Sequence, residues 1–238
     1  MLHSMNFIAA VFVLIMFSRV LMASADDMPL SQCYGSVSNG AITGSVQLPT
    51  SGDNFETYSL VAHGMGRTYV HQTVSQIMLD SYLSLVESHP DKKFKYAETG
   101  LEEGGKMYPH RTHQNGLSVD FMVPVLNKDN ESDYFRSDPL NRFGYDVEFD
   151  EQGQYGELRI DFEAMGAHIV ALHRAALDQG ADIRKVILDP VLQPYLFSTI
   201  WGEYLKAHVK FSKNRVWVRH DEHYHIDFEI PCHAGLPN

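Results

Sequence analysis

A single carboxylate in the most apolar stretch of the chain limits what this sequence can fold into. Asp120 lies within LSVDFMVPV, residues 117–125. Strand periodicity places Ser118 and Asp120 on one face of this segment and three apolar side chains on the other. Because an unpaired buried charge is costly, the fold must give Asp120 a partner. That partner could be an arginine, a hydrogen-bond network or a metal ion.

Two histidine-rich segments offer partners of the third kind. HRTH, from His110 to His113, precedes the apolar stretch, and HDEHYH, from His220 to His225, begins a second predicted strand. Period two places His223 and His225 on one face of that strand and apolar side chains on the other. Imidazoles and carboxylates are the usual ligands of catalytic zinc, which keeps one position open. Two strands with such groups on one face predict a zinc site.

The rest of the chain mixes helical and strand patterns without a regular βαβ repeat. Apolar spacing predicts helices over residues 70–86 and 161–179, the second with Asp161 as N-cap, and a third over residues 190–208 that Pro194 interrupts. This order predicts one α+β domain with a mainly antiparallel sheet and flanking helices. The strands are expected over residues 94–97, 117–125, 185–188, 216–219 and 223–230.

Residues 126–158 differ in character from their surroundings, since they are polar and acidic with few long apolar runs. Tyr145–Phe149 and Tyr155–Ile160 flank the sequence DEQGQ, which predicts a β-hairpin. We interpret this segment as a surface insertion on the same domain that overhangs the site.

The N-terminal region has the pattern of an export signal. Residues 7–17 form an apolar run of eleven, about half of a membrane span, and an A-x-A sequence follows at residues 23–25. The nearest basic residue, Arg19, follows the run instead of preceding it, so an uncleaved anchor is the alternative. We interpret residues 1–25 as a signal peptide and residues 26–238 as a single domain that is periplasmic or secreted.

The two cysteines, Cys33 and Cys232, lie near the two ends of the mature chain. In an oxidising compartment they suggest one disulfide bond. Closing a loop of about 200 residues would stabilise the fold by about 4–5 kcal/mol in the chain-entropy model. Two unpaired buried thiols are the alternative.

The charge balance argues against several classes of partner. Without residues 1–25 the chain has 18 basic and 30 acidic residues, a net charge of −12. General attraction to nucleic acid, anionic lipid or acidic wall polymers is therefore not expected. We expect no nucleic-acid partner and no membrane contact after signal cleavage, and an anionic substrate would need local recognition.

The histidine motifs also resemble those of a known family. HRTHQNGLSVD, HDEHYHIDFEIPC and the earlier GSVSNGAITGSVQLP resemble the penicillin-insensitive murein endopeptidases, in the wider group of zinc peptidases with lysostaphin, the D-Ala-D-Ala peptidases and the hedgehog proteins. The resemblance implies a hedgehog/D-Ala-D-Ala-peptidase-like fold with zinc bound by His113, Asp120 and His225. It implies that His223 acts as base or transition-state stabiliser. Further family histidines that line the site match His110 and His220.

Two residues depart from the pattern of this family. Ser118 stands where the family has an aspartate, so the surroundings of the metal ligands differ here. Glu222 replaces a small or basic residue. In the carboxypeptidase branch a Glu three residues before the last ligand is the base, and Glu222 has this spacing from His225. Strand parity favours His223 as the base instead, and a loop at residue 222 would remove that argument.

The resemblance implies an exported zinc endopeptidase that cleaves peptide cross-links of peptidoglycan, at a D-alanyl–diaminopimelate type of bond. The stem peptides of peptidoglycan would be the substrate. A D,D-carboxypeptidase or another wall-peptide specificity is one alternative, and a catalytically inert secreted zinc-binding module is a second. Use of the enzyme as a toxin against other bacteria would add an immunity or inhibitor protein as a partner.

Overall fold

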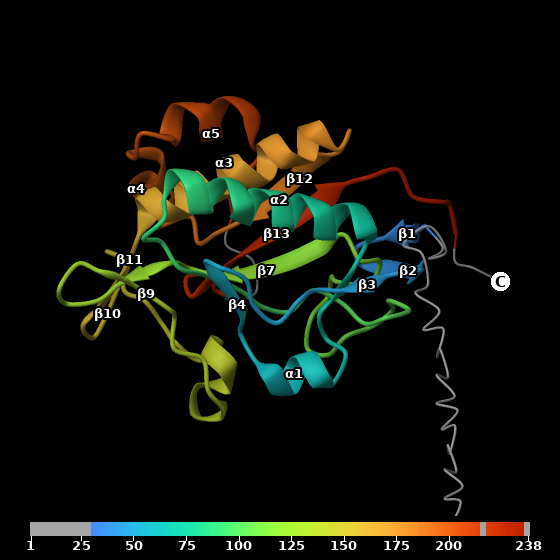
Figure 1. Cartoon of the computed structure of the whole chain (residues 1–238), viewed down its shortest axis with the longest axis horizontal. Coiled ribbons are helices and arrows are strands. Elements are labelled where there is room, and N and C mark those ends of the chain that lie inside the picture. Colours follow the sequence, from blue (N-terminus) through green and yellow to red (C-terminus); the bar gives the residue numbers. More distant parts are fainter. Residues whose placement is uncertain (1–29, 215–217, 236–238) are drawn as a thin grey trace, which may run out of the picture.

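The centre of the molecule is a five-stranded sheet (Figure 1). The computed structural model describes residues 30–214 and 218–235, and the predicted signal peptide lies outside them. Neighbouring strands run antiparallel, except that residues 55–57 pair in parallel with residues 94–96. The prediction of an α+β fold with a mainly antiparallel sheet is confirmed. The strand order is β12 (Asp182–Ile187), β13 (His223–Glu229), β7 (Ser118–Met122), β6 (Phe94–Tyr96) and β4 (Phe55–Thr57).

Two long helices, α2 (Gln72–Ser88) and α3 (Phe162–Asp178), cover one face of this sheet, and α1 (Leu60–Gly64) lies on the opposite side (Figure 1). The side chain of Asp161 accepts a hydrogen bond from the Ala164 amide, as expected of the N-cap. None of the helices in residues 30–214 and 218–235 is long and apolar enough to cross a membrane.

The third predicted helix is two short helices, α4 (Gln193–Phe197) and α5 (Gly202–His208), and the interruption lies at residues 198–201. The predicted break at Pro194 was wrong. Pro194 lies in the first turn of α4. A proline is tolerated there because the amides of the first turn have no partner within the helix.

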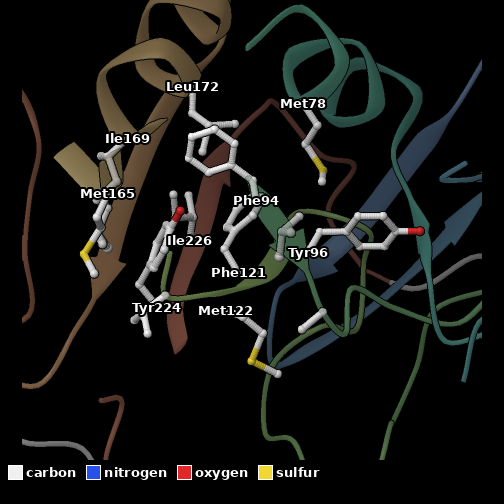
Figure 2. Packing of buried hydrophobic residues seen from close by; sticks show 14 of the residues in the cluster. Met78, Phe94, Tyr96, Phe121, Met122, Met165, Ile169, Leu172, Tyr224 and Ile226 are labelled. Atoms are coloured by element: carbon white, nitrogen blue, oxygen red, sulfur yellow. The ribbon is translucent and has the colours of Figure 1, made fainter. Parts of the chain in front are cut away.

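The apolar core lies between the sheet and the long helices. Phe121 from β7 and Tyr224 from β13 stack with ring centroids 5.4 Å apart, and His168 of α3 packs against both rings. Figure 2 shows Phe121, Tyr224 and Ile226 directed into the same layer as Ile169 and Leu172 of α3. The alternation of these strands therefore turns their apolar residues to the helices, as period two predicts.

Shorter strands complete the fold around this centre. The Cys33–Cys232 disulfide is present, with Cα atoms 4.8 Å apart, which confirms its prediction. It joins the first strand to the segment after β13. The short strands are β1 (Gln32–Ser36) with β2 (Asn39–Thr43), β3 (Val46–Gln47) with β5 (Tyr69–Val70), and the sheet of β10 (Gln154–Tyr155), β11 (Leu158–Ile160), β8 (Val125–Leu126) and β9 (Ser132–Asp133).

Two strand predictions were wrong. The hairpin near residue 150 is formed by β10 and β11, whereas Tyr145–Phe149 forms no strand. The amide of Phe149 donates instead to the carboxylate of Asp221 at 2.6 Å, so a side chain takes the place of a strand partner. Val218 and Arg219 are not in a strand either, and the other residues predicted with them lie outside the described part of the chain.

Candidate metal centre and active site

The predicted site residues meet on the sheet face that points away from α2 and α3. β7 and β13 are antiparallel neighbours, and their register places Asp120 opposite His225 and Ser118 opposite Asp227. Because their Phe121 and Tyr224 face the helices, the alternate residues of both strands face the other way. Asp120 is only 1% exposed there. The alternating side chains of two paired strands thus gather carboxylates and imidazoles in one buried place.

Two imidazoles approach the same oxygen of Asp120. His113 Nε2 lies 3.3 Å and His225 Nδ1 lies 2.8 Å from Asp120 Oδ1. Each ring is held through its other nitrogen, His113 Nδ1 at 3.0 Å from the Thr99 carbonyl oxygen and His225 Nε2 at 2.8 Å from Asp227 Oδ1. Such outer partners take the ring N–H and leave the inner nitrogen as a lone-pair donor.

Three electron-pair donors that converge on one point need a positive charge between them. His113 Nε2 has no hydrogen-bond partner among the described residues, although it is buried. Burial lowers the pKa of His225, but the Asp227 and Asp120 carboxylates outweigh this and raise it to about 9. Either a proton or a metal ion can supply the charge, and two imidazoles with one carboxylate are a zinc-type donor set. The residues present therefore fit a zinc ion.

Further groups surround the second oxygen of Asp120. His110 Nδ1 and His223 Nε2 each lie 3.8 Å from Asp120 Oδ2, and the Tyr145 hydroxyl donates to this oxygen at 3.0 Å. The nitrogens of His110 and His113 and an oxygen of Asp120 lie within 4.8 Å of one another, which makes these three a candidate metal site. His110 also forms an ion pair with Glu98 through Nε2.

His223 is oriented by its neighbour in the sequence. Its Nδ1 lies 2.8 Å from Glu222 Oε1, so its Nε2 is turned toward Asp120. Burial lowers the pKa of His223 to about 4 and raises the pKa of Glu222 to about 8. β13 begins at His223, so Glu222 precedes the strand and strand parity does not apply to it. The ring of His220 packs beside His223, with centroids 4.6 Å apart.

This constellation agrees with a comparison of whole sequences. The sequence pattern of the penicillin-insensitive murein endopeptidases matches residues 33–237. The chain belongs to this family. A penicillin-insensitive murein endopeptidase of Haemophilus influenzae is 25% identical over 203 residues, which cover 84% of this chain and 64% of the relative. The chain thus spans slightly less than two thirds of the length of that relative.

Ser118, which departs from the pattern expected of this endopeptidase family, supports the outer partner of His225. Its hydroxyl donates to Asp227 Oδ1 at 2.7 Å. Arg184 and Lys185 approach Asp227 Oδ2 at 3.2 and 3.7 Å. Burial raises the pKa of Asp227, but His225, the Ser118 hydroxyl and Lys185 together keep it below its usual range. Asp227 is therefore a carboxylate that accepts from His225.

Several residues of this endopeptidase-family site belong to none of the sequence motifs. Glu98 accepts hydrogen bonds from Tyr58 at 2.8 Å and from Arg67, and it pairs with His110. Its position two residues after β6, among buried residues, was a usable signal, because a buried carboxylate needs a partner. Tyr145 lies in an irregular polar segment, and no periodic pattern singles it out.

Every predicted residue of the metal centre lies in one cluster, and histidines elsewhere in residues 30–214 and 218–235 include two with local contacts. His71 caps α2, and His63 contacts the Leu48 carbonyl oxygen. The clustered residues are His110, His113, Asp120, His220, Glu222, His223 and His225.

Proposed function

We propose that this chain is an exported zinc endopeptidase that hydrolyses peptide cross-links of bacterial peptidoglycan. The convergence of His113 Nε2 and His225 Nδ1 on Asp120 Oδ1 carries the proposal. Catalytic zinc sites have three such protein ligands and one open position. Murein as the substrate comes from the family, whose members are endopeptidases of this polymer.

We assign the three metal ligands as His113, Asp120 and His225. His110 is the competing third ligand, since it is close enough to take part. Three contacts favour His225. Its Nδ1 shares Oδ1 with His113, its Nε2 is bonded to Asp227, and His110 instead pairs with Glu98 on the Oδ2 side. A His225→Ala variant should lose the zinc, whereas a His110→Ala variant should retain it, as elemental analysis of the purified proteins would measure.

The protein groups around the ligands then have distinct tasks. Zinc, when bound, supplies Lewis acidity that activates water as a nucleophile and polarises a peptide carbonyl. His223 takes up a proton at Nε2, and its Nδ1–H donates to Glu222 to hold the ring in that orientation. Because Glu222 is engaged with His223, we assign it as a positioning residue and His223 as the base. His110 and His220 line the site beside them.

The target bond that we propose is the D-alanyl–diaminopimelate cross-link. Purified wall sacculi incubated with the zinc-loaded mature protein should lose cross-linked dimeric peptides, and a chelator should prevent this. Release of terminal D-alanine with the cross-links intact would identify a D,D-carboxypeptidase instead. Intact sacculi in the presence of fully zinc-loaded protein would identify an inert zinc-binding module.

Export is part of the same proposal. A disulfide that joins Cys33 to Cys232 suits a chain folded in an oxidising compartment. Cleavage after residue 25 would give a mature protein that begins at Asp26, in the periplasm or outside the cell. N-terminal sequencing of the protein isolated from its host should find this start, whereas a retained apolar segment would identify an anchor.

A further inference from the structure

Tyr145 brings a phenol from the irregular segment 126–158 into the metal centre. Its hydroxyl lies 3.0 Å from Asp120 Oδ2, and its ring meets His223 edge-on with centroids 5.1 Å apart. We propose that Tyr145 is a positioning residue of this centre, which holds Oδ2 so that Oδ1 alone faces His113 and His225. The inference rests on the proposed function, because the carboxylate that it positions is the proposed zinc ligand.

The direction of the tyrosine hydrogen bond follows from its second contact. The Glu98 amide donates to the Tyr145 hydroxyl oxygen at 3.4 Å, so the hydroxyl proton is free to point at Asp120 Oδ2. A carboxylate that accepts a hydrogen bond at one oxygen is fixed in rotation and offers its other oxygen to a metal. Asp120 Oδ1 is then already oriented toward the imidazoles of His113 and His225.

The turn before Tyr145 is held together by side chains. The Asp138 carboxylate accepts from the Leu140 amide at 2.9 Å and so caps the short helix Pro139–Gly144. Asn141 Oδ1 accepts from the amides of Asp138 and Gly144, each at 2.9 Å, while its Nδ2 donates to the Arg136 carbonyl oxygen at 2.9 Å. Asn141 thus connects both ends of the turn through hydrogen bonds, and this fixes the position of Tyr145, which follows the turn.

The backbone of this turn adopts left-handed conformations in the three residues before Tyr145. Arg142 and Phe143 have φ angles of 48° and 59°, in the left-handed region. This region costs a non-glycine residue about 1–2 kcal/mol. Gly144 has φ 103°, and a Cβ atom there would lie 2.9 Å from the Phe135 ring and 3.0 Å from Met122 of β7. The turn is therefore packed onto the strand that carries Asp120, and strain of this kind clusters at functional sites.

A structural role and a positioning role of Tyr145 predict different effects on zinc affinity. Loss of a structural hydroxyl lowers the melting temperature and leaves the zinc affinity of the folded protein alone. Loss of a positioning hydroxyl weakens zinc binding, since outer partners of metal ligands contribute about 10–100-fold in affinity. Tyr145→Phe removes this hydroxyl alone and keeps the ring against His223.

Tyr204→Phe is the matched control. Its hydroxyl lies 2.8 Å from His173 Nδ1, and Tyr204 belongs to α5 on the helical side of the sheet. The zinc dissociation constants of the wild type and both variants would be measured in competition with a chelator, beside the melting temperatures of the zinc-free proteins. We expect Tyr145→Phe to bind zinc about 10–100-fold more weakly. Tyr204→Phe should bind zinc as the wild type does.

The outcomes separate the inference from the proposed function. Wild-type zinc affinity in Tyr145→Phe, with or without a lower melting temperature, would overturn the positioning role and leave the zinc peptidase intact. A wild-type protein that binds no zinc would overturn the proposed function and this inference together. Weaker zinc binding in both tyrosine variants would show a general effect of lost stability and would also overturn the positioning role.

Discussion

The two faces of the β7–β13 strand pair differ in how they are covered. On one face, Phe121 and Tyr224 pack against the regular helix α3, with His168 as the histidine among them. On the other face, Asp120 and His225 are covered by irregular segments that supply single side chains and carbonyl groups. The same two strands, with side chains that alternate in direction, thus support an apolar core and a polar centre.

This difference shows which interactions hold each region. Apolar packing is non-directional, so a helix with enough buried surface suits the first face. Hydrogen bonds to a buried carboxylate require donors at defined points, and a regular helix cannot present them at such varied angles. Loops that contain left-handed residues, such as the turn before Tyr145, meet this requirement. A substitution on the polar face should therefore lower activity more than stability. A substitution of the adjacent residue on the apolar face should lower stability more than zinc binding.

The largest effect is expected for Asp120→Ala, which removes the shared carboxylate of the polar face. This variant should retain no zinc and hydrolyse no sacculi, because His113 and His225 lose the oxygen on which both converge. It should still unfold in one cooperative transition in the presence of a chelator, because the packing of Phe121 is unchanged. Elemental analysis, the sacculus assay and thermal unfolding would measure this, and full zinc occupancy in the variant would refute the ligand assignment.

A smaller loss is expected for His223→Ala. Zinc should remain bound, whereas turnover should fall by about 10²–10⁴-fold, the usual contribution of a general base or acid. Glu222→Gln keeps a hydrogen-bond acceptor for His223 Nδ1 and serves as the matched variant. It should be affected less than His223→Ala. The opposite order of the two variants would make Glu222 the base and return the mechanism to the carboxypeptidase pattern.

These two faces also differ in how well the sequence predicts them. Period two in residues 117–125 and 223–230 correctly predicts which side chains face the core. The register that places Asp120 opposite His225 is a property of the folded sheet. The N-cap Asp161 is predicted equally well because it depends on a short local signal. The disulfide is predicted for another reason, since an exported chain with two cysteines allows one pairing within the chain. The contribution of Tyr145 has no such signal. Its place results from the side-chain contacts of Asn141 and from packing onto β7, which only the folded chain reveals.

Phe121→Ala tests the apolar face at the residue next to Asp120. Phe121 is fully buried against His168 and Tyr224, so its truncation should lower the free energy of unfolding by about 3–5 kcal/mol. The folded fraction should keep its zinc, because no polar group of the metal centre is removed. Denaturant unfolding at a fixed zinc concentration, together with elemental analysis, would measure both quantities. Loss of zinc from protein that remains folded would show that the two faces are coupled.

The smallest effect concerns His168, a histidine on the apolar face. Its Nδ1 contacts the Tyr224 hydroxyl, and burial lowers its pKa from 6.5 to about 3. Below pH 6.5 the unfolded chain therefore takes up a proton that the folded protein does not. Stability that is fully present above pH 6.5 is consequently lost as the pH falls toward 3.

His168→Gln keeps an acceptor for the Tyr224 hydroxyl and cannot titrate. Between pH 7.5 and 5.5 the wild type should lose about 1 kcal/mol more stability than this variant, as unfolding curves at each pH would measure. Comparison with the variant cancels the contributions of the site histidines, which both proteins share. Parallel pH profiles would mean that His168 has the same pKa in the folded and the unfolded protein. The apolar face would then admit a charged imidazole, and the contrast between the two faces would fail.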